Sequence, residues 1–312
     1  MSTGGRPRRF GVAFSGKIGP MSTHETALDQ SPLSHGESKA LVVEGGAMRG
    51  IFAAGVLDAF LEHNYRPFLR AYGVSAGATN LIGYLAGDHG RSRKIITGHA
   101  CQPDFIDWRR FARGGHLCDV CWLWQQSFTD VPLNLENYLS GTTELWVTTT
   151  SARTGEAHYF HLDESNMHDV LTASCAIPIA YRDYPLVNGE PMTDGGVADA
   201  IPVIKAYEDG ARDITVVLSR PPGYRKKPPR FAFVPRRLFR AYPALAEASL
   251  SRAERYNTTL SFIENPPQDC IIRVIVPPAE FAVGRLTQNQ ELLEQGYQEG
   301  HRAGLIYLDE MT

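Results

Sequence analysis

Two short apolar runs, each followed by a glycine-rich turn and a helix-forming segment, constrain the fold of this chain most strongly. Residues 40–43 lead into a turn at 44–50, and residues 68–72 lead into a turn at 73–77. A spacing of about 30 residues between such units is typical of βαβ connections in a parallel sheet. Both turns should therefore lie at the carboxyl edge of that sheet, where open α/β sheets place their sites.

The second turn has the sequence G-V-S-A-G and fits the G-x-S-x-G nucleophile elbow, in which a serine occupies a strained strand-to-helix turn. Gly73 and Gly77 would relieve the crowding of strand against helix and keep the Ser75 hydroxyl exposed. The helix behind it would direct its N-terminal N–H groups toward charge that develops during attack. Ser75 is therefore a candidate nucleophile, and a polar turn serine is the plain alternative, since the pattern alone is common by chance.

The first turn has the sequence E-G-G-A-M-R-G. A dinucleotide fingerprint is excluded because Ala47 stands where its second glycine is needed, and a P-loop is excluded because Ile51 and Phe52 follow Gly50 in place of Lys and Ser or Thr. The remaining functional interpretation is an oxyanion hole formed by the backbone N–H groups of Gly46 and Ala47. A tight turn without chemistry has about equal weight for this motif alone.

A third glycine-marked turn begins at Asp194 and continues through Gly195 and Gly196. It follows a predicted hairpin over residues 184–193 that is closed by an Asn-Gly turn. The glycines allow a sharp turn and a close approach to another segment, so the carboxylate is presented from a turn. Asp194 is thus a candidate base for Ser75, while a structural turn aspartate is the favoured interpretation of this motif considered alone.

Length and composition exclude several classes of protein. The 312 residues suffice for one large domain or two small ones, and 43% apolar with 21% charged residues is ordinary for a globular protein. A net charge of −3 predicts no nucleic-acid partner, and no apolar run approaches the roughly 20 residues of a membrane span. Five cysteines are an odd, sparse set, which argues against a disulfide framework and indicates a reducing, cytoplasmic location.

Three regions are expected along the chain. Residues 1–38 are rich in small and polar residues and have no apolar stretch after their arginines, so we expect a disordered tail without an export signal; Met1 and Met21 are both candidate starts. Residues 39–220 would form the catalytic core. Residues 221–312, with a basic loop, helices and a last strand, would complete or extend the same domain.

Further elements follow from local patterns. Residues 53, 56, 57, 60 and 61 predict a helix with one apolar face that excludes Asp58 and Glu62. Strands are predicted at 144–150, 157–160, 214–218 and 270–276, and helices at 167–176 and 200–207. Pro243 predicts an interruption or kink in the helix that ends near Glu264. Thr287, with Gln290 three residues later, predicts a capping box at the start of the last helix.

Cysteine and histidine residues gather between positions 99 and 124, where Cys118 and Cys121 form one C-x-x-C motif. A structural zinc site needs four ligands, and Cys101 with His99 or His116 would complete one. No second C-x-x-C pair is present at finger spacing, so we expect no metal and interpret these thiols as apolar groups under a Trp-rich loop. No cofactor is expected.

Residues 220–240, from Arg220 to Arg240, carry eight basic residues, no acidic residue and several aromatic ones. A solvated, proline-broken loop is the plain interpretation. The functional one is peripheral contact with anionic lipid head groups at the inner membrane surface, with the aromatic rings entering the interface. No recognised motif supports nucleic-acid binding there.

Taken in order, the three turns resemble those of patatin-like phospholipases, which carry a G-G-G-x-R/K-G oxyanion loop, a G-x-S-x-G elbow and a D-G-G/A turn. Residues 173–178, A-S-C-A-I-P, also resemble an A-S-x-A-x-P stretch of that family. The resemblance covers roughly residues 38–220. It implies a three-layer α/β fold, with a central, mostly parallel sheet and helices on both faces. The implied catalytic residues are the Ser75–Asp194 dyad. The implied oxyanion loop comprises Gly45, Gly46, Ala47, Met48, Arg49 and Gly50, and Arg49 helps to fix it. The elbow glycines Gly73 and Gly77 and the glycines of the aspartate turn, Gly195 and Gly196, complete the implied site.

Two residues depart from the family pattern. Ala47 replaces the usual third glycine, which is tolerable if that residue keeps a negative φ. Ala200 stands where many members have Asn two residues before the proline that is Pro202 here. Neither departure touches the dyad, but both bear on the substrate subgroup.

The resemblance implies acyl transfer from a phospholipid, a lysophospholipid or another acyl ester to Ser75, followed by hydrolysis of the acyl-enzyme. Spacing alone indicates only an esterase-like site. Two alternatives remain: an α/β-hydrolase esterase with a Ser75–Asp194–His301 triad, and a catalytically silent scaffold that binds lipid through residues 220–240.

Overall fold

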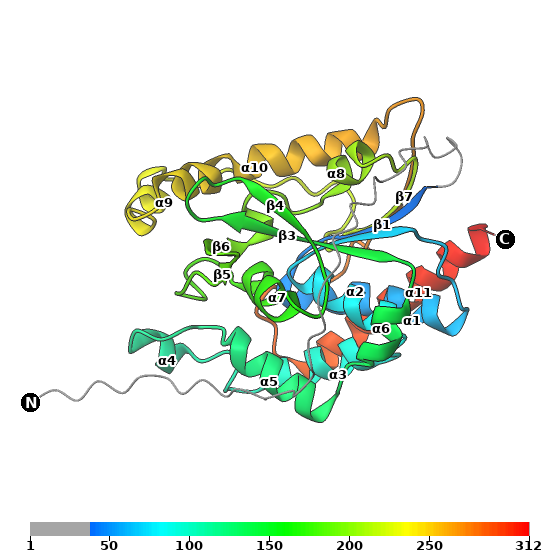
Figure 1. Ribbon diagram of the computed structural model, residues 1–312, viewed down its shortest axis with the longest axis horizontal. Helices are drawn as coiled ribbons and strands as arrows, with labels where there is room; N and C mark the ends of the chain where they lie inside the picture. The colour runs from blue at the N-terminus through cyan, green and yellow to red at the C-terminus, as the bar shows by residue number, and fades with distance from the viewer. Residues whose placement is uncertain (1–37, 312) are drawn as a thin grey trace, which may run out of the picture. The chain divides into compact units, whose positions relative to one another are not determined.

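A mixed sheet with strand order β5-β6-β3-β2-β1-β7-β8 is the centre of this computed structural model, which describes residues 38–311 (Figure 1). The strands are β1 (Lys39–Val43), β2 (Arg70–Val74), β3 (Glu144–Ser151), β4 (Ala157–His161), β5 (Leu186–Val187), β6 (Glu190–Asp194), β7 (Asp213–Val217) and β8 (Ile271–Ile275). Five strands run parallel (β1, β2, β3, β7 and β8), while β4 and β6 pair antiparallel with β3. The predicted mostly parallel sheet is confirmed.

Helices and short 3₁₀ turns connect these strands. The helices are α1 (Gly50–Glu62), α2 (Ala76–Ala86), α3 (Arg91–Thr97), α4 (Trp108–Ala112), α5 (Val120–Asp130), α6 (Leu135–Ser140), α7 (Met167–Cys175), α8 (Val203–Glu208), α9 (Phe233–Leu238), α10 (Pro243–Glu264) and α11 (Gln290–Met311). The 3₁₀ turns are η1 (Ala47–Arg49), η2 (His99–Cys101) and η3 (Gly195–Val197). The expected tail over residues 1–38 and the choice between Met1 and Met21 lie outside the described residues, except for Ser38.

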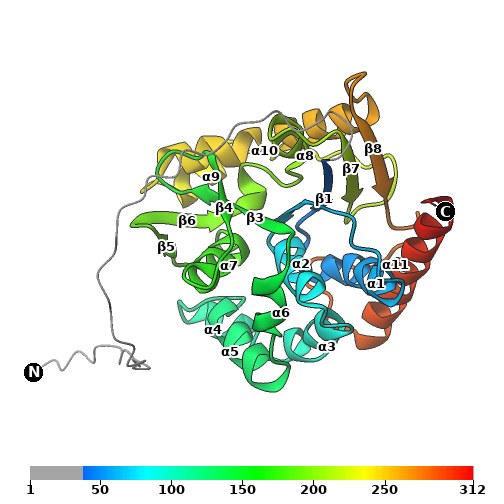
Figure 2. The ribbon, with the colours of Figure 1, turned by 45° about the vertical axis from the view of Figure 1, so that its right-hand side comes forward.

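The side chains of β1 show why helices cover both faces of the sheet. Leu41 and Val43 belong to a buried cluster with residues of α1, α2, α7 and α11, whereas Ala40 and Val42 pack in another cluster with residues of α8 and α10. Successive strand residues point to opposite faces, so this unbroken apolar run feeds two cores. Figures 1 and 2 show α8 and α10 on one side of the sheet and α1, α2 and α11 on the other. The predicted three-layer fold is confirmed.

Three local predictions are wrong at helix starts. Pro243 does not kink a helix but is the first residue of α10, where its missing N–H costs no hydrogen bond. Helix α11 begins at Gln290, and Asn289 Oδ1 accepts the N–H of Leu292, while the Thr287 hydroxyl accepts the N–H of Gly284. The predicted capping box is therefore absent. Helix α8 begins at Val203, three residues later than predicted.

Within the described part of the chain, no helix is both long and apolar enough to cross a bilayer.

Candidate active site

Ser75 occupies the turn between β2 and α2. Its φ of 52° and ψ of −125° lie in a region that non-glycine residues rarely adopt, so this turn is strained. The elbow packs tightly against the end of β1: a Cβ atom on Gly77 would lie 2.3 Å from the carbonyl oxygen of Val43. Gly77 therefore allows the close approach that brings Ser75 next to the first glycine turn, while Gly73 lies within β2.

Ser174, the penultimate residue of α7, links the elbow to β3 through two hydrogen bonds of its hydroxyl. The backbone N–H of Ser75 donates to Ser174 Oγ at 2.8 Å, and that hydroxyl donates to the carbonyl oxygen of Thr148 at 2.7 Å. All three residues are buried. Ser174 lies in the A-S-x-A-x-P stretch, but the sequence assigned it no role, because nothing local shows which backbone group its hydroxyl meets.

Replacement of Ser174 by alanine is expected to lower the free energy of unfolding by about 1–3 kcal/mol, because it leaves the Ser75 N–H and the Thr148 carbonyl buried without this partner. Urea denaturation followed by circular dichroism measures the change. The matched control is Ser261→Ala, which removes an exposed hydroxyl on α10 that bonds only within its own helix. Equal stabilities of the two variants would contradict the bracing role of Ser174.

Asp194 is the last residue of β6. This strand pairs with β3, which carries the Thr148 carbonyl that Ser174 bonds. Its Oδ1 accepts the N–H of Gly196 at 2.7 Å. A Cβ atom on Gly195 would lie 2.2 Å from the carbonyl oxygen of Thr148, so glycine is needed where this turn crosses β3. Burial raises the pKa of the Asp194 carboxyl above its ordinary value, while Arg252, the Gly196 N–H and the Ser75 hydroxyl oppose that rise.

The first glycine turn lies against the same space. Gly45, Gly46 and Ala47 line one cavity together with Ser75 and Asp194, which we call the serine–aspartate cavity. Its other lining residues are Ile177, Pro178, Gly196, Val197, Arg252 and Arg285. The structure thus brings together the three turns that are far apart in the sequence.

The backbone of this turn differs from expectation at Ala47. Its φ is 50°, so the negative φ under which alanine would be tolerated is not observed, and this alanine bears strain that a glycine would avoid. The N–H of Met48 donates to the carbonyl oxygen of Arg285, and that of Arg49 to the carbonyl oxygen of Gly46. Within residues 38–311, the N–H groups of Gly46 and Ala47 have no such backbone acceptor outside the regular helices and strands.

Buried polar groups tie the first turn to the end of β7. Arg49 donates through Nε to the carbonyl oxygen of Ser219 at 3.1 Å. Glu44 Oε2 accepts the N–H of Ser219 at 2.6 Å, and its Oε1 accepts the hydroxyl of Tyr256 at 3.0 Å. On the other side, the carbonyl oxygen of Gly50 accepts the side-chain amide of Asn80 at 2.7 Å. These bonds fix both ends of the turn in place.

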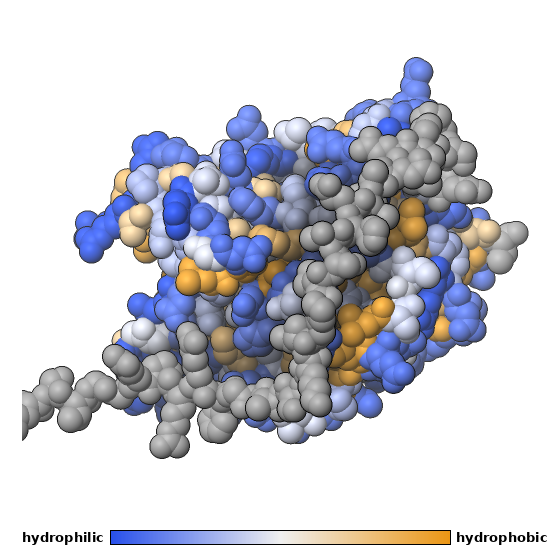
Figure 3. All heavy atoms as spheres, viewed as in Figure 1, coloured by the Kyte–Doolittle hydropathy of each residue, from blue (hydrophilic) through white to orange (hydrophobic). Residues whose placement is uncertain are grey.

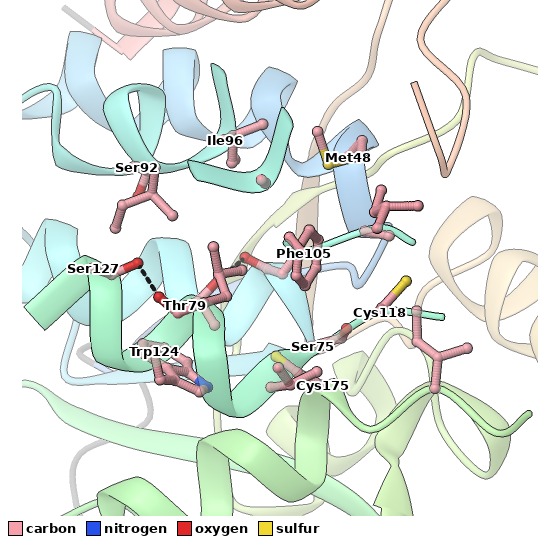
Figure 4. A pocket seen from close by; sticks show the side chains of 18 of the residues that line it. Met48, Ser75, Thr79, Ser92, Ile96, Phe105, Cys118, Trp124, Ser127 and Cys175 are labelled. Carbon is pink, nitrogen blue, oxygen red and sulfur yellow. Dashed lines mark hydrogen bonds between the residues drawn. The ribbon is translucent and has the colours of Figure 1, made fainter. Parts of the chain in front are cut away.

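A second cavity of about 100 Å³ opens from Ser75 between η1, α3 and α5 (Figure 4). Its lining is largely apolar and includes Met48, Ile96, Phe105, Leu123, Trp124 and Cys175. We call it the apolar cavity. Ala47, Ser75, Ile177 and Arg285 line both cavities, so Ser75 lies where an apolar space meets a polar one.

His301 does not take part in this arrangement. Its Nε2 lies 2.8 Å from Glu62 Oε2, at the end of α1 opposite the glycine turn. No histidine is among the described residues that line the serine–aspartate cavity. The alternative triad of Ser75, Asp194 and His301 is therefore contradicted by the position of His301.

The cysteine-rich segment is dispersed in the structure. Cys118 lines the apolar cavity, Cys121 Sγ lies 3.2 Å from the hydroxyl of Tyr181, and Cys101 Sγ lies 3.4 Å from the carbonyl oxygen of Ile96. Among residues 38–311, no group of three or more His, Cys, Asp or Glu side chains is arranged to hold a metal ion.

Two arginines at the site were not predicted. Arg252, from α10, donates through Nε to the carbonyl oxygen of Gly196 at 2.6 Å, and Arg285 comes from the loop between β8 and α11. Both line the serine–aspartate cavity. They follow Asp194 by 58 and 91 residues in the sequence, and no motif marks them, so only the fold reveals their position.

Two family models match parts of this chain. The patatin-like phospholipase family model matches residues 41–207, and a domain of unknown function, DUF6363, matches residues 242–312. The uncharacterized protein YjjU of Escherichia coli K12 is 33% identical over 281 residues, which cover 86% of this chain and 76% of that protein.

Two solved structures are similar at lower identity. VipD from Legionella pneumophila has a TM-score of 0.46 at 15% identity, over 88% of this chain and 67% of that one. Human GIVD cytosolic phospholipase A2, in complex with a fluorophosphonate inhibitor, has a TM-score of 0.38 at 11% identity, over 86% of this chain and 58% of that one. The family and relative matches in sequence each span more than half of the chain. On these matches, this chain belongs to the patatin-like phospholipase family, a family of lipid acyl hydrolases.

Proposed function

We propose that this chain is a serine-dependent lipid acyl hydrolase of the phospholipase A or lysophospholipase type, with Ser75 as nucleophile and Asp194 as general base. The observation that carries the proposal is the shared cavity. Ser75, Asp194 and the first glycine turn line one space, and that space meets an apolar cavity at Ser75. An acyl ester needs this combination, because its reactive carbonyl is polar and its chain is not.

The reaction proceeds in two acyl transfers. Asp194 accepts the hydroxyl proton as Ser75 Oγ attacks the carbonyl carbon, and the tetrahedral intermediate then expels the alcohol, which takes the proton from Asp194. Water next attacks the acyl-enzyme while Asp194 accepts its proton. Collapse of the second intermediate releases the fatty acid, and the proton returns to Ser75.

Backbone N–H groups of Gly46 and Ala47 are proposed to stabilise the oxyanion in both steps. They lie at the start of η1 beside Ser75, and the hydrogen bonds of Met48 and Arg49 hold their peptide groups in place. Each such donor is typically worth about 10²–10³ in rate. The positive φ of Ala47 is strain of the kind that functional turns retain.

Replacement of Asp194 by asparagine is expected to remove most ester turnover and to leave the protein at least as stable. Asn retains the oxygen that accepts the Gly196 N–H but cannot accept a proton. Burial raises the folded-state pKa of Asp194, so its ionised form at neutral pH opposes folding, and the stabilising effect of the protonated form is lost as pH rises through that pKa.

Two measurements check this prediction for Asp194. In the wild-type protein, kcat/KM should rise with pH around a midpoint above the usual value of about 3.9 for aspartate. In the variant, the thermal midpoint at pH 7 should be equal or higher, with Asp183→Asn, an exposed carboxyl, as the matched control. An active Asp194→Asn protein would remove Asp194 from the role of base.

Labelling with a fluorophosphonate probe, followed by mass spectrometry of the peptides, tests the proposed function. The expected result is one adduct, on Ser75, that is absent from the Ser75→Ala protein and formed normally by the Ser140→Ala control, which changes an exposed serine at the end of α6. A folded sample without an adduct on Ser75 would contradict an activated serine.

Peripheral contact with the inner membrane surface through residues 220–240 belongs to the same proposal. Around α9, Phe231, Phe233 and Leu238 are at least half exposed, and the face in Figure 3 shows apolar side chains among hydrophilic ones there. Basic and apolar side chains together suit an anionic lipid surface. The silent-scaffold alternative predicts liposome binding without turnover of any ester, whereas the hydrolase loses turnover but retains liposome binding after Ser75→Ala.

A further inference from the structure

A third cavity, of about 360 Å³, lies beside the serine–aspartate cavity. Among the described residues that line it, five are basic and none is acidic: Arg220, Lys226 and Lys227 from the segment after β7, Arg252 from α10, and Arg285 from the loop before α11. The remaining lining residues are Tyr224, Pro229, Pro235, Ser249 and Ala253. We call this the basic cavity. It concentrates positive charge in a chain whose net charge is −3.

The basic side chains of this cavity lack carboxylate partners. Among residues 38–311, none of the five forms an ion pair within 4.0 Å. Two nearby arginines outside the cavity are paired, Arg225 with Glu264 at 2.6 Å and Arg236 with Glu247 at 2.8 Å. The negative charge that acts on Lys226 and Arg252 comes from Glu44 and Asp194, and neither carboxylate forms an ion pair with them within 4.0 Å.

The pKa of Lys226 shows the effect of burial among other positive charges. Its Nζ lies 3.8 Å from the centre of the Tyr256 ring. Burial, followed by the nearby charge of Arg252, lowers the pKa of Lys226 to about 7, and Glu44 opposes the shift. An anion held beside this ammonium group would favour its charged form and offset the repulsion.

The basic cavity shares part of its lining with the site of the proposed reaction. Arg252 and Arg285 line both it and the serine–aspartate cavity. The hydrogen bond from Arg252 Nε to the carbonyl oxygen of Gly196 holds this guanidinium at the turn that begins with Asp194. A ligand that extends from Ser75 past these arginines reaches Lys226 and Lys227.

We propose that the basic cavity binds a phosphate headgroup of the acyl-ester substrate, so that the enzyme prefers esters that carry an anionic phosphate to neutral esters with the same acyl chain. This inference rests on the proposed function of Ser75. In a glycerol-based phospholipid, only glycerol carbons separate the ester from the phosphate. An ester at Ser75 with its chain in the apolar cavity then places the phosphate beside Arg252 and Arg285.

The test compares hydrolysis of a 1-acyl-glycerol 3-phosphate with that of the 1-acyl-glycerol of the same chain. The ratio of their kcat/KM values is measured for the wild-type protein, for Lys226→Met/Lys227→Met, and for the control Lys94→Met, an exposed lysine on α3 that lines none of the three cavities. The double variant is expected to lower the ratio at least about tenfold, mainly through KM, because it removes two charge-assisted contacts to phosphate. The control should retain the wild-type ratio.

Other outcomes separate this inference from the proposed function. An unchanged ratio in the double variant, with normal fluorophosphonate labelling of Ser75, would overturn the headgroup site and leave the hydrolase intact. If the folded wild-type protein formed no fluorophosphonate adduct on Ser75, the proposed function would instead be overturned.

A binding experiment on the Ser75→Ala protein distinguishes the source of the phosphate. Calorimetric titration with the 1-acyl-glycerol 3-phosphate, presented below its micelle-forming concentration, should give tighter binding than glycerol 3-phosphate or inorganic phosphate, and Lys226→Met/Lys227→Met should weaken it. Inorganic phosphate that binds as tightly as the lipid would indicate a site for a free anion and overturn the headgroup assignment.

Discussion

Replacement of Ser75 by alanine is expected to lower kcat for lipid-ester hydrolysis by at least about 10⁴-fold, in line with the loss of an activated nucleophile in serine hydrolases. Ser75 and the buried Asp194 line the same cavity, and no other serine lines the serine–aspartate cavity among the described residues. Turnover of a chromogenic acyl ester and of a phospholipid measures the loss. Activity within tenfold of the wild type would remove Ser75 from the mechanism.

Two substitutions at Ser75 should have the same effect on activity but different effects on stability. At a φ of 52°, both serine and alanine are strained, whereas glycine adopts this conformation at little steric cost. The Ser75→Gly protein should therefore be inactive, yet more stable than Ser75→Ala by about 1 kcal/mol or more. Urea denaturation of the two variants checks this order, and a less stable glycine variant would show that the elbow is not strained.

Ser75 and Asp194 should also behave as one unit. When two groups act in a single proton transfer, loss of either removes most of what both provide. The Ser75→Ala/Asp194→Asn protein is therefore expected to be no slower than the slower single variant. Multiplicative losses would indicate that the two residues act in separate steps.

The local parts of the fold and site were predictable from the sequence because short-range rules determine them. The hairpin turn at Asn188 and Gly189 has positive φ at both residues, which that pair of residues favours. The elbow around Ser75 follows from a strand, a glycine-bounded turn and a helix. Parallel strands bring the first two turns to the same edge of the sheet, so their proximity was also predictable.

Groups that meet through tertiary packing were not predictable. Arg252 and Arg285 reach the site from segments without a motif, and the Ser174 hydroxyl finds its partners only after α7 packs under the elbow. The positive φ of Ala47 reflects the fixed ends of its turn, which override the preference of alanine. Pro243 predicts a break because no local signal shows that α10 begins at this residue.

Helix α11 gives the clearest example of a long-range feature with a readable local signal. Gly296, Gly300 and Gly304 recur every four residues and so share one face of the helix. Figures 1 and 2 show α11 beside α1, and Gly300 and Gly304 lie directly against residues of α1. The contact also covers Asp58, which lay outside the predicted apolar face but is buried and accepts the hydroxyl of Tyr297 at 2.9 Å.

Replacement of Gly300 by alanine is expected to lower the free energy of unfolding by about 3 kcal/mol or more, because the new methyl group forces two packed helices apart. A Cβ atom there would lie 2.0 Å from the carbonyl oxygen of Phe52 on α1, whereas one on Gly304 would lie 2.8 Å from the side chain of Ala59. Gly304→Ala should therefore cost less than Gly300→Ala. Urea denaturation measures both.

Gly83→Ala on α2 is the matched control for this pair, since its Cβ would have no neighbour closer than 3.5 Å. There, the helix propensity of alanine should stabilise the protein by up to about 1 kcal/mol. Opposite signs for Gly83 and Gly300 would show that the close contact of α1 with α11, and not helix propensity, sets the requirement for glycine. Because α1 begins directly after the turn that holds Gly46 and Ala47, Gly300→Ala should also reduce ester turnover in the protein that remains folded. Full turnover in that fraction would show that the turn keeps its position without the support of α11.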